Sequence, residues 1–596
     1  MRRLMLAGPP FALFDGDAGS AVLLTGLQHA FAVDAGADPR AAFGAIEEAL
    51  ALGQWVALAA DYALGACFEA TVPPAPCGRP VLRVWLFADA RILDAPGIAA
   101  FLAEQLAALP EHQRAAGIAE MSVAVDAAKY AAQVSRIRRW IGDGDCYQIN
   151  LTFPLTFALY GHPLALYARL RKRQPVRYGG FLGCGEETIL SFSPELFFER
   201  VGERVVTRPM KGTAPRGRTA LEDQANRAAL LASAKERAEN IMIVDLLRND
   251  LGRLAQPGKV QVEALCEAED YPTLWQMVST VAADLPGVGI ADLFAALFPC
   301  GSITGAPKIR AMQRIAELEA SARGLYTGSL GWLAPNGDAR FNVAIRTLEV
   351  AADGQARLGV GSGIVIDADA AREYTECLLK ASFLTAFDPG FELVETLRLE
   401  EGAYPLLALH LERLQASARS LGFACRLAEV SAALAAAAAA RPQALFRVRL
   451  SLAHDGSCGV QVAVLREDAT KRWRVCLASE ALPVDDYLLR HKTTARARYD
   501  RALAALAERP GLFDAIFLNT RGEVCEGARS NVFVERDGLL LTPPLACGLL
   551  PGVMRRTLLE SGRAVEQVLR REDLLQAPAL YVGNALRGLL PVVLDV

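Results

Sequence analysis

A sharp break at Asp388-Pro389-Gly390 divides this chain. Proline disfavours helix in the residue before it and glycine favours a turn, so the helix-like run through Lys380 cannot continue past this point. A strand-like segment, residues 391–396, follows directly. The chain has 596 residues, too many for one hydrophobic core, and its length suggests about three to four domain-sized units. Because the break is short, we expect two packed halves rather than domains on a flexible tether.

Charge and hydropathy exclude several kinds of partner. The net charge is −4 and no run of Lys or Arg occurs, so a nucleic acid or an anionic membrane has no electrostatic support. The apolar stretch before Gly8 and the Ala-rich tract at 432–440 are too short for a signal peptide or a membrane span. Twelve cysteines form no C-x-x-C pair, which disfavours zinc fingers. We expect a reduced, cytoplasmic protein with no nucleic-acid or membrane partner.

Hydrophobic periodicity predicts a mixed α/β (α+β) fold on both sides of the break, without the regular βαβ alternation of a barrel. Amphipathic helices are predicted over 235–247 and 371–385, and a further helix begins near His410 and stops at Gly422. Strands are predicted over 189–193, 204–207, 358–366, 446–452 and 472–479.

Two predicted helices carry a Glu-x-x-Glu pair, Glu236/Glu239 and Glu373/Glu376. A spacing of three places both carboxylates of a pair on one helix face. Two such faces brought together would suit Mg²⁺, which takes one or two protein carboxylates and keeps room for a substrate carboxylate. Each pair alone is more typical of a solvated helix face.

Other groups in the first half can bind anions or react. The backbone N–H groups of Gly361-Ser362-Gly363 can bind an anion, although the segment also fits a simple tight turn. Arg346 and Lys380 can bind carboxylates, although either one alone fits a surface ion pair. Lys211 lies where a strand meets a Gly-containing turn, and it becomes a nucleophile only if its pKa is lowered.

Five segments of the first half occur in a characteristic order: Ser193-Pro194-Glu195, Lys211-Gly212-Thr213, Lys235–Arg253, Gly301–Lys308 and Gly361–Lys380. Together they resemble the chorismate-utilising enzymes, and within them the aminodeoxychorismate synthase component I group. The resemblance covers about 145–385. The related anthranilate synthases carry alanine at the position of Lys211.

The resemblance implies a covalent route through Lys211. The lysine would add at C2 of chorismate and expel the C4 hydroxyl, and ammonia would then attack C4 and release the lysine, with Glu195 as general acid and base. Glu239 and Glu376 would ligate Mg²⁺, supported by Glu236 and Glu373. The residues that would bind the substrate are Thr304, Tyr326, Arg346, Gly363 and Lys380. No glutaminase motif is evident, so ammonia would come from solution or from a separate glutamine amidotransferase subunit.

The second half carries three scattered candidates: Lys492, Glu526, and the segment Gly548–Arg555, which opens a helix whose free N–H groups suit a phosphate. Individually they fit a surface lysine, an exposed acid and an ordinary helix start. Together they resemble the class IV aminotransferase-like, fold-type IV pyridoxal-phosphate enzymes over about 390–596, with two α/β subdomains.

This second resemblance implies that Lys492 binds pyridoxal 5'-phosphate covalently and that Glu526 pairs with its ring nitrogen. Arg413, Val553, Met554 and Asn584 would hold the phosphate. The family includes 4-amino-4-deoxychorismate lyase as well as branched-chain and D-amino-acid transaminases. We select the lyase because it consumes the product expected of the first half. Such enzymes are commonly dimers, so we expect a homodimer through the second half.

The resemblances imply three parts: a supporting segment over 1–120, a chorismate-binding catalytic domain over 121–388 with the chorismate-utilising fold of packed sheets and helices, and a lyase domain over 391–596. The predicted function is the two-step synthesis of 4-aminobenzoate, a folate precursor. One alternative is an anthranilate or isochorismate activity in front, or a transaminase behind. Another is that one half is a degenerate binding module.

Overall fold

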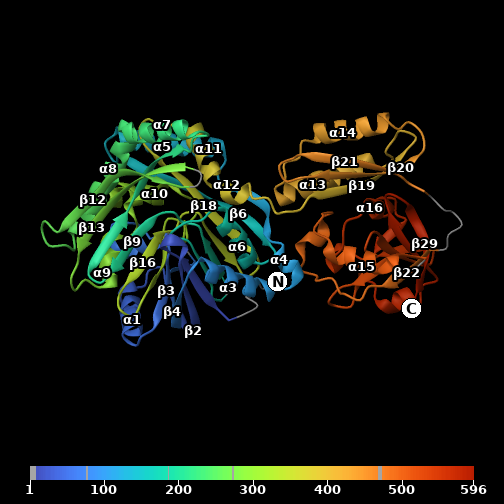
Figure 1. The fold of residues 1–596 in the computed structure, drawn as a ribbon, viewed down its shortest axis with the longest axis horizontal. Helices are drawn as coiled ribbons and strands as arrows, with labels where there is room; N and C mark the ends of the chain where they lie inside the picture. Colours follow the sequence, from blue (N-terminus) through green and yellow to red (C-terminus); the bar gives the residue numbers. More distant parts are fainter. Residues whose placement is uncertain are drawn as a thin grey trace. The chain divides into compact units, whose positions relative to one another are not determined.

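The computed structural model describes residues 9–74, 78–185, 187–271, 274–466, 473–509 and 511–595. The chain forms two compact units (Figure 1). Unit 1 comprises residues 1–109, 122–157 and 166–385, and unit 2 comprises residues 110–121, 158–165 and 386–596. Unit 2 therefore takes two short segments from the first 165 residues.

The first 385 residues supply one hydrogen-bonded network of eighteen described strands. Antiparallel pairs dominate it, such as β2 with β4 and β12 with β13. The strands are β1 (Phe11–Asp15), β2 (Ala21–Asp34), β3 (Trp55–Ala60), β4 (Pro80–Leu93), β5 (Gly117–Val123), β6 (Gln148–Tyr160), β7 (Gly180–Gly183), β8 (Glu187–Ser191), β9 (Leu196–Val201), β10 (Arg204–Arg208), β11 (Met210–Pro215), β12 (Val260–Asp270), β13 (Leu274–Asp284), β14 (Gly305–Ala306), β15 (Ser329–Leu333), β16 (Ala339–Val343), β17 (Thr347–Ala351) and β18 (Gln355–Ile364).

The first 385 residues also form helices, and α5 packs against α11 (Figure 1). They are α1 (Pro39–Ala51), α2 (Gly65–Phe68), α3 (Ala95–Ala107), α4 (Glu111–Arg114), α5 (Ala127–Gly142), α6 (Pro163–Arg173), α7 (Ala220–Ala232), α8 (Ala234–Gly252), α9 (Ile290–Leu297), α10 (Lys308–Leu318), α11 (Ala370–Lys380) and α12 (Ser382–Thr385), together with the short 3-10 helix η3 (Gly301–Ile303).

An aromatic core fixes the position of α8. Phe198, Phe294 and Phe341 come from β9, α9 and β16 and contact one another at ring-centroid distances of 5.1–5.7 Å. Val244 and Leu251 of α8 belong to the same buried cluster. Because this face of α8 is buried, the first two turns of the helix are held in a fixed orientation.

Unit 2 has two subdomains, each with its own sheet. The small subdomain pairs β19 (Leu393–Glu400), β20 (Leu445–Leu452) and β21 (Cys458–Val464) and carries α13 (Leu407–Leu421) and α14 (Leu427–Ala439). The strands of the large subdomain are β22 (Trp473–Leu477), β23 (Leu512–Leu518), β24 (Val524–Gly527), β25 (Asn531–Arg536), β26 (Leu539–Thr542), β27 (Ala564–Glu566), β28 (Ala579–Asn584) and β29 (Gly588–Asp595). Its helices are η4 (Tyr487–Arg490), α15 (Ala497–Ala507), η5 (Leu545–Cys547), α16 (Val553–Glu560) and α17 (Arg571–Leu575).

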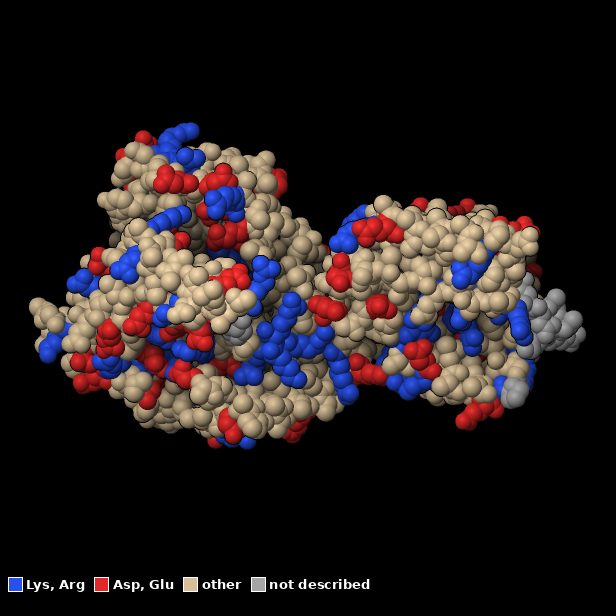
Figure 2. Space-filling view, turned by 45° about the horizontal axis from the view of Figure 1, so that its top comes forward, with Lys and Arg blue, Asp and Glu red and all other residues tan. Residues whose placement is uncertain are grey.

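The mixed α/β fold class is confirmed. Gly422 ends α13 with φ of 75°, a left-handed conformation that glycine adopts at little cost. The helix predicted over 371–385 is two helices, because the Ala381 N–H bonds to Leu378 instead of continuing the regular ladder, and α12 starts afresh. Among the described residues, none of the helices combines the length and apolar character needed to cross a bilayer. Figure 2 shows basic and acidic side chains on both units, without one sign prevailing over the whole face.

Candidate active sites

Side-chain caps start the two helices that carry the predicted carboxylate pairs. The Ser233 hydroxyl accepts a hydrogen bond from the Glu236 N–H at 3.3 Å and begins α8, so Glu236 and Glu239 lie in its first two turns. Asp369 caps α11 in the same way at 2.9 Å, and Glu373 follows in the first turn. The caps therefore determine where each carboxylate pair begins.

The carboxylates of the two helices affect one another. Burial raises the pKa of Glu236, and the charges of Glu239 and Glu376 raise it further. Glu236 also lies against Gly212, where an added Cβ would be 3.0 Å from its Oε2, so the carboxylates adjoin the Lys211 segment. No group of three acidic, His or Cys side chains in the described ranges makes a preformed metal centre. Mutually repelling carboxylates nevertheless fit Mg²⁺, which needs only one or two protein carboxylates.

Glu195 and Lys211 are the reactive candidates of unit 1, and each affects the pKa of the other. Burial raises the pKa of Glu195 to about 7, against the hydrogen bond that Ser302 Oγ donates to its Oε1 at 2.6 Å and the charge of Lys211. Burial lowers the pKa of Lys211, and Lys380 lowers it further, whereas Glu195 and Glu239 raise it. A carboxyl that is partly protonated at neutral pH can donate a proton, and an amine with a lowered pKa is a better nucleophile.

The groups predicted to bind carboxylates differ in whether they already have partners within the protein. Arg346 is half-buried with φ of 49°, burial lowers its pKa, and no carboxylate of the described residues forms an ion pair with it. Lys380 donates to Gly361 O at 2.9 Å and pairs with Glu376 at 2.8 Å. Gly363 lies at the end of β18. Arg346 is therefore the group in most need of an anionic ligand.

Tyr326 and Thr304 are buried, with relative exposures of 8% and 0%. The Tyr326 ring lies against Gly359, where an added Cβ would come within 2.1 Å of it. The Thr304 hydroxyl donates to the Cys300 carbonyl at 2.5 Å. Both side chains are held firmly, but neither makes a described contact with Lys211.

Gln148 is a functional candidate that the sequence motifs did not reveal. It lies on β6 opposite Ala306 of β14, and it is 1% exposed. Neither its Oε1 nor its Nε2 has a hydrogen-bond partner among the described residues, and Nε2 lies 2.8 Å from where a Cβ would stand on Gly363. A buried amide without partners is costly, so a ligand beside Gly363 would satisfy it. One glutamine in a strand gives no such signal in the sequence.

Lys492 is the reactive candidate of unit 2. Its carbonyl accepts a hydrogen bond from the Val394 N–H at 2.8 Å, which holds the lysine segment against β19. Burial lowers the pKa of Lys492 to about 8, and Arg413 lowers it too, whereas Glu395 and Glu526 raise it. A larger neutral fraction at neutral pH favours reaction with an aldehyde.

Glu526 lies on β24, 6% exposed, in the same neighbourhood. It accepts hydrogen bonds from the Tyr499 hydroxyl at 2.6 Å and from the Leu550 N–H at 3.1 Å. Burial raises its pKa to about 7, and the charge of Lys492 lowers it. A fixed, buried carboxyl of this kind fits the protonated ring nitrogen of a pyridine cofactor.

A buried ion network orients Arg413. Its Nε and Nη2 donate to Glu395 at 2.9 and 2.6 Å, and its Nη1 donates to the Pro551 carbonyl at 3.1 Å. His410 contacts the same Glu395 at 2.7 Å. Burial opposes ionisation of Glu395, but Arg413 and His410 hold its pKa down to about 2. The network therefore places the guanidinium beside the start of α16.

The N-terminus of α16 fits a phosphate. Gly552 precedes the helix and no side chain caps it, so Val553 and Met554 present N–H groups without a side-chain partner. An added Cβ on Gly552 would come within 1.9 Å of Asn531 Oδ1, so this turn tolerates no larger residue. Arg413, which contacts the Pro551 carbonyl, therefore lies close to Val553 and Met554.

Asn584 lies close to this helix start, but its side chain already makes hydrogen bonds within the protein. Its Oδ1 accepts from the N–H groups of Leu586 and Arg587 at 3.2 and 2.9 Å, and its Nδ2 donates to the Arg529 carbonyl. The neighbouring Gly583 pairs with Asn531. The side chain therefore fixes the turn after β28.

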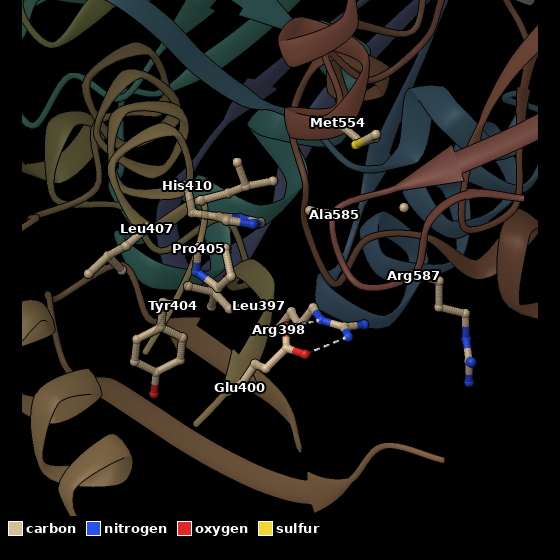
Figure 3. Close-up of a pocket in the computed structure, with 12 residues that line it drawn as sticks. Leu397, Arg398, Glu400, Tyr404, Pro405, Leu407, His410, Met554, Ala585 and Arg587 are labelled. Carbon is tan, nitrogen blue, oxygen red and sulfur yellow. Dashed lines mark hydrogen bonds and ion pairs between the residues drawn. The ribbon is translucent and has the colours of Figure 1, made fainter. Parts of the chain in front are cut away.

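A cavity of about 480 Å³ opens between the two subdomains of unit 2 (Figure 3). The small subdomain lines it with residues between Leu397 and His410, and the large subdomain with Met554, Ala585, Arg587 and Gly588. Lys492 and Glu526 are not among its lining residues. The cavity meets the candidate phosphate site at Met554.

Two segments match families of known proteins. Residues 27–386 match the family described as chorismate binding enzyme, and residues 392–594 match amino-transferase class IV. Aminodeoxychorismate synthase component 1 of Bacillus subtilis (strain 168) is 42% identical over 253 residues, which is 42% of this chain and 54% of that protein. Anthranilate synthase component 1 of Thermus thermophilus is also 42% identical, over 273 residues, 46% of this chain and 59% of that protein.

The chain spans about half the length of the curated relatives it matches. The solved structure of anthranilate synthase component I from Streptococcus pneumoniae TIGR4 is 26% identical, with a TM-score of 0.54, and the match covers 61% of this chain and 92% of that one. Sequence identity therefore does not separate the two groups of synthases.

Proposed function

The chain belongs to the chorismate binding enzymes, and on that premise we propose that its first 386 residues aminate chorismate at C4. The observation that carries this proposal is the lowered pKa of Lys211, next to a Glu195 whose pKa is raised to about 7. An amine with a lowered pKa and a carboxyl that is partly protonated at neutral pH together suit a displacement in which a hydroxyl must leave.

In the proposed reaction, the Lys211 amine forms a bond to C2 while the C4–O bond breaks. Glu195 donates a proton to that oxygen, which leaves as water. Ammonia then bonds to C4, the C2–N bond to Lys211 breaks, and the lysine regains its free amine. The net change is chorismate plus ammonia to 4-amino-4-deoxychorismate plus water. Arg346, which has no described acidic partner, and the unpaired amide of Gln148 are suited to bind the substrate.

Mg²⁺ is the proposed metal cofactor of this step. Glu239 and Glu376 would ligate it, with Glu236 and Glu373 in support, and the metal would bind a substrate carboxylate. Burial is the main cause of the raised pKa of Glu236, and the like-charge repulsion that adds to it is relieved by a divalent cation. Ammonia would come from solution or from a separate glutamine amidotransferase subunit. The name component 1 of the relatives is compatible with such a second component.

We further propose that the second half is a pyridoxal 5'-phosphate-dependent lyase that releases 4-aminobenzoate and pyruvate. Arg413 and the start of α16 would hold the phosphate, and Glu526 the ring nitrogen. The bound cofactor supplies an electron sink next to C4. Lys492 takes the proton from C4, the C3–O bond breaks, pyruvate leaves, and the ring becomes aromatic.

The experiment that tests both proposals is incubation of the full chain with chorismate, Mg²⁺, ammonia and pyridoxal 5'-phosphate, followed by product identification. We expect 4-aminobenzoate and pyruvate. Formation of 2-aminobenzoate would instead support an anthranilate synthase. That alternative is favoured by the Thermus thermophilus relative, which is 42% identical, as is the Bacillus subtilis one. Lys211→Ala should abolish amination, and unimpaired amination in that variant would refute the covalent route.

Dimerisation through the second half remains a prediction from the resemblance to fold-type IV enzymes. Sedimentation equilibrium of the full chain at micromolar concentration measures it directly. We expect twice the mass of one 63.9 kDa chain. A single monomeric species over the working concentration range would contradict the prediction.

A further inference from the structure

Unit 2 contains two segments from the chorismate-binding region, Pro110–Met121 and Ala158–Ala165. We call them the brace. Gly161 adopts φ of 73°, and an added Cβ there would come within 2.3 Å of the Ala115 carbonyl, so the two segments pack closely against each other. The His162 N–H also donates to the Gln113 carbonyl at 2.8 Å.

The brace contributes to the hydrophobic core of unit 2. Ala119 and Tyr160 belong to the same buried cluster as Phe391 and Leu488. The Tyr160 ring stacks on the ring of Tyr487, with centroids 6.0 Å apart and an interplanar angle of 13°. These contacts bury Tyr160 to 2% exposure. The brace is thus packed against the element η4, which begins at Tyr487.

Polar contacts connect the brace to the same element and to α15. The Tyr487 hydroxyl donates a hydrogen bond to Glu120 Oε1 at 2.9 Å. Because this hydroxyl has only one proton, it accepts the hydrogen bond from the Ser420 hydroxyl at 2.8 Å. Glu120 holds φ of 55°, an uncommon conformation for a residue other than glycine. Arg501 also donates to both oxygens of Glu111, at 2.9 and 2.7 Å.

Tyr487 is close to the reactive lysine along the chain. Its ring lies 5.3 Å from that of His491, whose Nδ1 is 3.0 Å from Ser417 Oγ. Lys492 is the next residue, and its carbonyl is fixed by β19. The Lys492 loop is therefore held by β19 at the lysine itself and by η4 just before the lysine. The brace packs against η4.

We infer that the brace positions Lys492 for the cofactor, through the contacts of Glu120 and Tyr160 with Tyr487. The cofactor-binding loop of the second half is then completed by residues of the first half. Glu120, Tyr160 and Tyr487 act through the loop and are positioning residues. The inference rests on the proposed cofactor role of Lys492.

The test uses the full chain without cofactor and measures hydrogen–deuterium exchange of the amides of residues 487–494. Tyr487→Phe keeps the ring and removes the hydroxyl, and we expect exchange about tenfold faster or more, as for loss of a hydrogen bond to a charged group. Glu120→Ala should act alike, and Glu120→Gln, which retains an acceptor oxygen, should be intermediate. The matched control is Tyr581→Phe, since the Tyr581 hydroxyl also donates to a glutamate, Glu535, at 2.8 Å in the same unit.

A second readout is the visible absorption of the chain titrated with pyridoxal 5'-phosphate. We expect several-fold weaker binding in Tyr487→Phe and unchanged binding in Tyr581→Phe. Exchange at residues 487–494 that matches the wild type in both Tyr487→Phe and Glu120→Ala would overturn the inference. A wild-type chain that does not bind the cofactor would refute the proposed lyase function instead, while the exchange data would still decide whether the brace holds the loop.

Discussion

At the scale of single residues, the Ser302 hydroxyl affects the pKa of Glu195, the proposed acid of unit 1. It donates to the charged form of Glu195 and so opposes the effect of burial, which raises the pKa of Glu195 to a net value of about 7. Ser302→Ala removes that contribution, and the pKa of Glu195 should rise by about one unit, since one unit equals about 1.4 kcal/mol. Amination needs the protonated acid, so the alkaline limb of the kcat/KM profile should move to higher pH. An unshifted limb would exclude Glu195 as the acid.

Glu395 links ionisation to the stability of unit 2. Its pKa is about 2 in the folded chain against an ordinary value of 4.5, so its contribution to stability is complete above pH 4.5 and is lost as the pH falls through about 2. The shift corresponds to about 3 kcal/mol. Glu395→Gln should therefore be less stable at pH 7 and lose less stability between pH 6 and pH 3. Urea unfolding at the three pH values measures this; equal acid sensitivity in both proteins would contradict it.

At the scale of elements, α8 and α11 should act together on the metal. Glu239→Gln or Glu376→Gln removes one proposed charged ligand, worth about 1.5–3 kcal/mol, so the Mg²⁺ concentration for half-maximal amination should rise about 10- to 100-fold. The control Glu263→Gln removes a carboxylate on β12 that pairs with Arg204, and it should leave the Mg²⁺ dependence unchanged. Equal Mg²⁺ dependence of all three variants and the wild type would exclude the metal role of both helices.

Signals that act within a few residues predict helices such as α13. Contacts between residues distant in sequence leave no such signal, so they could not be predicted. Gly422 and the apolar face after His410 identify α13 because both act within a few residues. The break at Ala381 was missed because no glycine or proline marks it. The unpaired amide of Gln148 depends on the approach of β14 and Gly363. The packing of Tyr160 on Tyr487 joins residues more than 300 apart, and no periodicity in one sequence reveals such a pair.

At the scale of the whole molecule, each proposed reaction has its own lysine in its own unit, so the two activities should be separable. Lys492→Ala should accumulate 4-amino-4-deoxychorismate, and Lys211→Ala should convert that compound to 4-aminobenzoate at the wild-type rate. A mixture of the two variants should then form 4-aminobenzoate from chorismate after a lag, because the intermediate must diffuse between molecules. Chromatography of timed samples measures the lag. Loss of both activities in either single variant would show instead that the two units depend on each other.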